Sequence, residues 1–157
     1  MVNIADLSKA ELVRNNEKLV KELLIKQGYE FTKILGNRVQ TKYKISKNNE
    51  THIIKIMGYR YNDKTSGNYA YVQKHDFDLQ EYKFLFFVLY YGTNVYILKI
   101  PSTVFINPAP NSAFKNRDYE KGKSLPEYGI VINSRTINEL LIYQEVSSCN
   151  HFSLCNN

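Results

Sequence analysis

The clearest pattern of apolar and polar positions lies near the N-terminus. Five apolar residues recur at the spacing of one helix face: Leu12, Leu19, Val20, Leu23 and Leu24. The segment Ser8-Lys9-Ala10-Glu11 just before them has the pattern of a capping box, and Gly28 follows as a helix stop signal. The pattern therefore predicts one amphipathic helix over residues 9–27.

Shorter alternating and apolar runs after this helix predict strands. Three of them, residues 29–35, 38–46 and 51–57, are separated by polar turns. Two more, residues 84–91 and 95–100, form an apolar hairpin around a glycine turn. The pattern predicts five strands in this part of the chain.

The remaining segments predict loops and two short elements. Residues 58–82 are polar and rich in Tyr, Asn, Asp and Gly, and residues 101–126 contain all four prolines, so both predict loops. A short strand is expected over 129–132. A helix is expected near 136–146, where Thr136-Ile137-Asn138-Glu139 repeats the capping-box pattern.

This order of elements predicts a single α/β domain over residues 1–147, with a mixed, mainly antiparallel central sheet flanked by helices, and a frayed tail over 148–157. The most apolar run, residues 84–91, is too short to cross a bilayer, and the first 12 residues lack the apolar core of a secretion signal. A cytoplasmic protein without membrane contact is expected.

The distribution of charge adds a functional indication. The chain of 157 residues has 21 basic and 15 acidic residues, a formal net charge of +6. Residues 31–62 hold seven basic residues against the single acid Glu50, which equals the whole excess. Nucleic acid is the commonest polyanion that such a field would attract, although lysines also serve solubility alone.

The candidate nucleic-acid contacts in this stretch are Arg38, Lys44, Lys47, Lys55, Tyr59, Arg60 and Tyr61. The tyrosines suit base stacking or phosphate contact in a loop that faces DNA. They equally suit simple alternation in a hairpin, where every other ring packs inward.

One pair of polar residues suggests chemistry. Strict alternation over residues 38–46 places Gln40 and Lys42 on the same strand face. A carbonyl oxygen beside an ammonium group suits a metal-dependent nuclease, in which the oxygen helps hold Mg²⁺ and the lysine orients the attacking water. The alternative is an ordinary solvated strand face.

The segments around this pair resemble the PD-(D/E)XK nuclease superfamily, in particular small restriction-like and homing-endonuclease-like members with Gln in the E/Q-x-K triplet. The resemblance covers about residues 10–101: a helix that ends in Gln27-Gly28-Tyr29-Glu30, the strand motif Val39-Gln40-Thr41-Lys42, and an apolar strand pair that ends at Pro101. It implies a restriction-endonuclease-like fold, with Gln40 as a metal ligand and Lys42 as the catalytic lysine.

The resemblance also implies an upstream acid as the principal metal ligand, and the sequence offers Glu30. A two-residue turn at Gly36-Asn37 would place Glu30 on the face opposite Lys42, whereas a register shifted by one residue would bring it onto the same face. Glu30 also suits a salt bridge to a neighbouring lysine, and Glu17 is the fallback acid. Without a carboxylate near Gln40 the domain would bind nucleic acid without cleaving it.

These expectations combine into one hypothesis, an Mg²⁺-dependent endonuclease that hydrolyses phosphodiester bonds of double-stranded DNA, of restriction or homing type. Glu30, Gln40 and Lys42 would form its catalytic site, with Glu30 and Gln40 holding the metal. Cutting both strands would favour a symmetric homodimer. The alternatives are an inactive DNA-binding module of the same fold, or a protein-interaction or inhibitor domain whose basic face meets an acidic partner.

Overall fold

A computed structural model describes residues 3–34, 41–118 and 124–145. The elements of the large sheet and its helix are α1 (Lys9–Lys26), β1 (Glu30–Ile34), β2 (Lys42–Lys47), β3 (Glu50–Arg60), β5 (Tyr82–Tyr91) and β6 (Asn94–Pro101). The remaining elements are η1 (Ile4–Asp6), β4 (Asn68–Gln73), η2 (Lys74–Asp76), η3 (Ser102–Phe105), β7 (Phe114–Arg117), β8 (Glu127–Ile132) and α2 (Ile137–Leu141).

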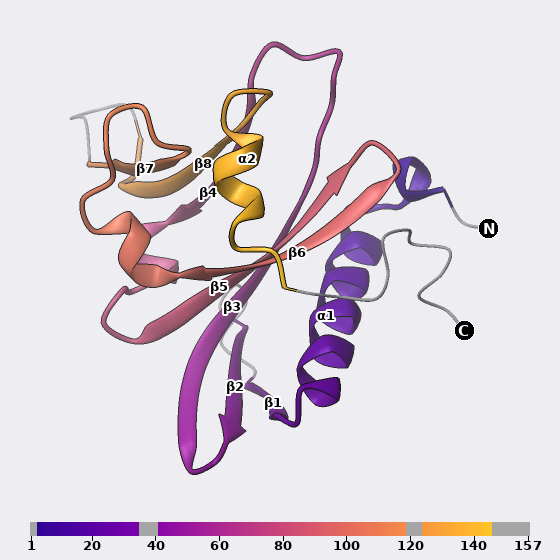
Figure 1. Cartoon of the computed structure of the whole chain (residues 1–157), viewed down its shortest axis with the longest axis vertical. Helices are drawn as coiled ribbons and strands as arrows, with labels where there is room; N and C mark the ends of the chain where they lie inside the picture. Colours follow the sequence, from indigo (N-terminus) through magenta and orange to yellow (C-terminus); the bar gives the residue numbers. More distant parts are fainter. Residues whose placement is uncertain (1–2, 35–40, 119–123, 146–157) are drawn as a thin grey trace.

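The strands form two sheets. The large sheet has the order β1-β2-β3-β5-β6, and its neighbours are antiparallel except for the parallel pair β3 and β5. The small sheet has the antiparallel order β4-β8-β7. Helix α1 lies against one face of the large sheet, and the small sheet lies on the other side (Figure 1). The predicted mixed, mainly antiparallel α/β sheet is confirmed.

The expectation that helices flank the sheet is only partly met. Within the described ranges α1 is the one substantial helix, because α2 has five residues. Strand β5 shows how both faces are filled: Phe86 and Val88 pack towards α1, whereas Leu85, Phe87 and Leu89 pack towards the small sheet. Burial on both faces explains the continuous apolar run of this strand.

Helix α1 follows the sequence pattern closely. Its capping box is formed: the Ser8 hydroxyl accepts a hydrogen bond from the Glu11 amide at 3.2 Å, and the Glu11 carboxylate accepts one from the Ser8 amide at 2.7 Å. Asn16 stands in the apolar stripe yet is buried, and its Oδ1 accepts a hydrogen bond from the Tyr90 hydroxyl at 2.6 Å. A side chain at Gly58 of β3 would collide with Asn16, so this glycine permits the close packing of α1.

The prediction that residues 58–82 form a surface loop is wrong. Strand β3 continues to Arg60, and residues 68–73 form β4 at the edge of the small sheet. Ala70 and Val72 are buried, whereas Tyr71 between them is exposed, which is the alternation of a half-buried strand. Residues 101–126, also predicted as a loop, contain η3 and β7.

The predicted second capping box does not form. The Thr136 hydroxyl donates to the Val131 carbonyl at 2.7 Å, and the Glu139 carboxylate accepts hydrogen bonds from the Ser112 hydroxyl and the Ala113 amide. Helix α2 (Ile137–Leu141) is also shorter than the predicted 136–146. After α2 the chain runs beside β6, where the Lys99 amide donates to the Tyr143 carbonyl at 2.8 Å.

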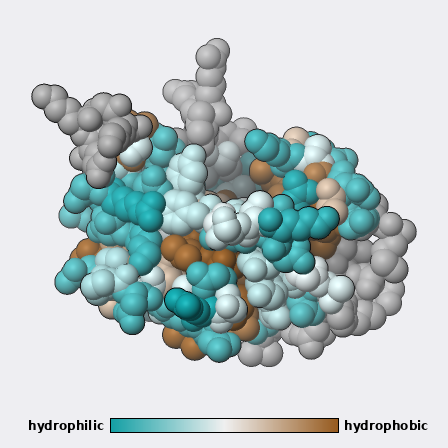
Figure 2. Space-filling model, turned by 90° about the horizontal axis from the view of Figure 1, so that it is seen from above, coloured by the Kyte–Doolittle hydropathy of each residue, from teal (hydrophilic) through white to brown (hydrophobic). Residues whose placement is uncertain are grey.

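Some sequence predictions fall outside the described residues, namely the Gly36-Asn37 turn and the tail over 148–157. No helix within the described ranges is long and apolar enough to cross a membrane. Seen from above, the surface is mainly hydrophilic, with a group of hydrophobic residues near the middle of the view (Figure 2).

Candidate functional site

The register between β1 and β2 decides which face Glu30 occupies. Glu30 pairs with Ser46, Thr32 with Lys44, and Ile34 with Lys42. Directly paired residues share a face, so Glu30 lies on the face of Lys42. The pairing with Ser46 is shifted by three residues from the register of a two-residue turn, not by the one residue that was predicted. However, its partner Ser46 is four residues from Lys42, about 13 Å along the strand. Gln40 and Arg38 lie outside the described residues.

The carboxylate that contacts Lys42 is Glu81, immediately before β5. The distance from Lys42 Nζ to Glu81 Oε1 is 2.5 Å, and the ammonium also lies 5.9 Å from the centre of the Tyr82 ring. The hydrogen bond to Glu81, with smaller contributions from Tyr82 and Asp78, raises the pKa of Lys42. The raised pKa keeps Lys42 in its charged form, paired with the Glu81 carboxylate.

Lys55 extends this group of charges. The β2–β3 register, continued by one residue, places Lys55 beside Lys42 on the same face. Burial lowers the pKa of Lys55, and the nearby Asp76 carboxylate partly offsets this effect. This group of side chains lies where the large sheet meets the segment after β4. It consists of Lys42, Lys55, Asp76, Glu81 and Tyr82.

The sequence predicts a metal site formed by Glu30 and Gln40. Within residues 3–34, 41–118 and 124–145, no three Asp, Glu, His or Cys side chains converge as metal ligands. Glu30 is distant from Lys42 along the strand, and Gln40 is not described.

Several predicted nucleic-acid contacts have partners within the protein. Arg60 Nη1 donates to the carbonyls of Ile4 at 2.9 Å and Leu7 at 3.0 Å, and so fixes the N-terminal segment. The Tyr59 hydroxyl donates to Asn68 Oδ1 at 3.1 Å. Both residues therefore have structural roles that the sequence pattern did not indicate.

The predicted lysines at the other end of the β1–β3 region are exposed. Lys44 projects from β2 opposite Thr32 of the edge strand β1. Lys47 is also exposed; its ammonium lies 5.2 Å from the centre of the Tyr29 ring and donates to the Gln27 carbonyl at 2.6 Å. These two contacts hold Lys47 at the C-terminal end of α1, where the helix dipole favours a cation.

Helix α1 contributes basic residues that lie outside the basic stretch 31–62 of the sequence. The helix holds five basic and three acidic residues, and Lys21 Nζ lies 5.9 Å from the centre of the Phe31 ring of β1. Five exposed lysines of α1, β1 and β2 are called the basic edge: Lys21, Lys26, Lys33 and Lys47 on the α1 side of β1, and Lys44 on the opposite side. Summing the charge of each segment alone could not find this grouping, because it joins a helix to two strands.

Glu17 of α1 binds two side chains of the neighbouring strands, Lys33 of β1 and Tyr43 of β2. Its carboxylate lies 2.8 Å from Lys33 Nζ and accepts a hydrogen bond from the Tyr43 hydroxyl at 2.7 Å. Burial raises the pKa of Glu17, but the hydrogen bonds from Lys33 and Tyr43 together outweigh it, and the pKa lies below its usual value. The fallback acid is thus paired with a lysine of the opposite face from Lys42.

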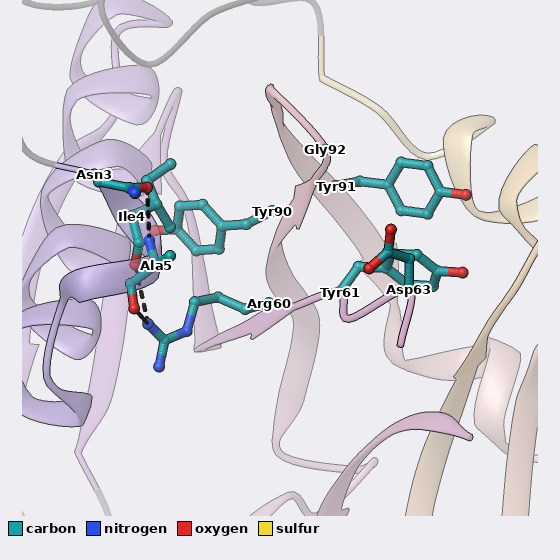
Figure 3. A pocket seen from close by; sticks show the side chains of 9 residues that line it. All are labelled: Asn3, Ile4, Ala5, Arg60, Tyr61, Asp63, Tyr90, Tyr91 and Gly92. Carbon is teal, nitrogen blue, oxygen red and sulfur yellow. Dashed lines mark hydrogen bonds between the residues drawn. The ribbon is translucent and has the colours of Figure 1, made fainter. Parts of the chain in front are cut away.

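A cavity of about 540 Å³ lies at the carboxyl ends of β3 and β5. Its lining comes from the N-terminal segment, the end of β3 with the loop that follows, and the β5–β6 turn: Asn3, Ile4, Ala5, Arg60, Tyr61, Asp63, Tyr90, Tyr91 and Gly92 (Figure 3). The rings of Tyr61 and Tyr91 are 4.4 Å apart between centres. Two of the predicted nucleic-acid contacts, Arg60 and Tyr61, thus line a cavity.

Comparison with known proteins gives no further assignment. No protein-family model, no curated protein and no solved structure matches the chain.

Proposed function

We propose that this protein binds nucleic acid by contacting the phosphate backbone with its basic edge. The observation that carries this proposal is the grouping of five exposed lysines from α1, β1 and β2 around the edge strand β1. Phosphate contacts by lysine supply most of the sequence-independent affinity for nucleic acid.

The shape of this region supports the proposal. The β2–β3 hairpin extends away from the small sheet, towards the bottom of the view (Figure 1). Its tip is a tight turn in which Asn48 and Asn49 both have positive φ, of 54° and 65°, as in a type I′ turn. Strand β1 pairs with β2 as far as Ser46, so the tip of the hairpin is the part narrow enough to enter the major groove of duplex DNA, and double-stranded DNA is the proposed partner.

Two double variants test the binding surface. Lys26→Gln/Lys44→Gln removes two exposed lysines of the basic edge, and Lys64→Gln/Lys83→Gln removes two exposed lysines elsewhere, with the same change in charge. Fluorescence anisotropy with a duplex of about 20 base pairs at low salt should show weakening by about tenfold or more for the first variant only. Equal weakening by both variants, or no binding by the wild type, would contradict the proposal.

Hydrolysis of phosphodiester bonds is a second candidate. The specific observation that favours it is the contact between Lys42 and Glu81, which provides a carboxylate beside the proposed catalytic lysine. Among the lysines of the basic edge, Lys44 projects from the same face of β2 as Lys42, so a phosphate bound at Lys44 would lie near Lys42. A PD-(D/E)XK-type endonuclease with a restriction-endonuclease-like fold, acting as a homodimer, remains a hypothesis built on this arrangement.

A plasmid-nicking assay tests this second candidate. Nicking is expected with Mg²⁺ and not with EDTA, and it should fall by at least about 100-fold in Lys42→Ala and in Glu81→Gln. Asp118→Asn, which removes a carboxylate paired with Lys74 elsewhere, is the control. If both variants retain metal-dependent nicking, Lys42 and Glu81 are not the catalytic site. If the wild type binds DNA without nicking it, only the proposal of nucleic-acid binding is supported.

A further inference from the structure

The cavity at the carboxyl ends of β3 and β5 is a separate site from the basic edge. Its volume of about 540 Å³ is within the range of small-molecule sites in proteins. In open sheets with parallel strands, ligands bind beyond the carboxyl ends of those strands. β3 and β5 are the parallel pair of the large sheet, and both end at this cavity, at Arg60 and Tyr91.

One side of the cavity is aromatic. The rings of Tyr61 and Tyr91 are inclined by 37° with their centres 4.4 Å apart, and each comes from the end of one of the two parallel strands. A planar aromatic ring is the group that stacks best on such a pair.

The cavity lining also includes one acidic and one basic side chain, Asp63 and Arg60. The Asp63 carboxylate is exposed beside the tyrosine pair, and it makes no hydrogen bond or ion pair with another described residue. Arg60 projects from the opposite face of the large sheet, on the side of α1, so the cavity reaches from the tyrosine pair to Arg60 around the ends of β3 and β5 (Figure 3). Its Nη1 donates to backbone carbonyls, while Nη2 and Nε have no hydrogen-bond partner among the described residues.

We propose that this cavity binds a mononucleotide. The base would stack on Tyr61 and Tyr91, the Asp63 carboxylate would accept a hydrogen bond from a ribose hydroxyl or a base amino group, and the free donors of Arg60 would bind the phosphate. A nucleotide has these three chemical parts in that order. The cavity shares no residue with the basic edge, so this proposal is tested independently of the proposed nucleic-acid binding.

Isothermal titration calorimetry of the full chain with AMP, adenosine and ribose 5-phosphate tests this proposal. AMP should bind, and the two fragments should each bind at least about tenfold more weakly, because each lacks one of the two ends. Tyr91→Leu and Asp63→Asn should each weaken AMP binding by about fivefold or more. Tyr71→Leu, at an exposed tyrosine of β4, should leave it unchanged.

Three results would overturn the assignment. They are no heat of binding with AMP up to about 1 mM, AMP binding that Asp63→Asn and Tyr91→Leu leave intact, and binding of spermidine in place of AMP. Because Asp63 is exposed, its substitution should not disturb folding, so Asp63→Asn decides the question if Tyr91→Leu fails to fold. The Lys26→Gln/Lys44→Gln variant should bind AMP as the wild type does, which separates this site from the basic edge.

Discussion

The two ends of strand β3 use positive charge in different ways. Near its hairpin end, Lys44 and Lys47 are exposed beside the edge strand β1. Towards its carboxyl end, Arg60 bonds to backbone carbonyls of the N-terminal segment, and between the two ends Lys55 is half-buried. All four belong to the same basic stretch of the sequence. The difference teaches that charge counted along a sequence is not the charge available to a ligand.

The largest expected effect concerns the carboxyl end. Arg60→Ala should lower the free energy of unfolding by about 2–3 kcal/mol, because the carbonyls of η1 lose a charged donor. Urea denaturation followed by circular dichroism measures this change. Lys44→Gln, at the exposed end, should change stability by less than about 0.5 kcal/mol. Equal losses of stability in the two variants would remove the distinction between the two ends.

A smaller effect is expected at the basic edge itself. Glu17→Gln should cost about 1 kcal/mol at pH 7, because the carboxylate loses its ion pair with Lys33 and a hydrogen bond from Tyr43. The pKa of Glu17 is lowered on folding, so its contribution is complete above about pH 4.5 and disappears as pH falls through the lowered value.

Urea titrations between pH 7 and pH 3 test the sign of this dependence. The cost of Glu17→Gln should shrink as the pH falls, whereas Glu22→Gln, at an exposed glutamate of the same helix, should have little effect at any pH. A cost that stays constant down to pH 3 would show that the charge of Glu17 is not what stabilises the fold.

The smallest effect is expected at Lys55. Burial lowers the pKa of Lys55, so its charged form is disfavoured in the folded protein, and Lys55→Met should raise stability at pH 7 by up to about 1 kcal/mol. The stability of the wild type should rise with pH towards 10.5 more than that of the variant does. If Lys55→Met lowers the affinity for DNA as much as Lys44→Gln does, Lys55 contacts DNA and this interpretation of Lys55 is wrong.

Much of the fold could be predicted from local sequence signals. The capping box at Ser8 and Glu11 specified the start of α1, and the apolar hairpin around Gly92 was correct within two residues at each end. The second box failed because Thr136 and Glu139 found tertiary partners in Val131 and Ser112, which no local pattern contains. Strand β4 was missed because polar and aromatic residues occupy its exposed positions.

The candidate site was less predictable, because its contacts join distant segments. Alternation correctly placed Lys42 and Lys44 on one face of β2, and an alternative turn register placed Glu30 with them. Nothing in the sequence indicated that Glu81, 39 residues after Lys42, would be its partner. The cavity lining likewise joins residues 3–5 to residues 60–63 and 90–92, and such a grouping exists only after the sheet has formed.

The salt dependence of DNA binding tests the central claim most directly. Each phosphate contact contributes about 0.9 to the slope of log K against log salt concentration for duplex DNA. The slope for Lys26→Gln/Lys44→Gln should therefore be shallower than that of the wild type by about 1.8, and the slope for Lys64→Gln/Lys83→Gln should be unchanged. Identical slopes for all three proteins would contradict nucleic-acid binding through the basic edge.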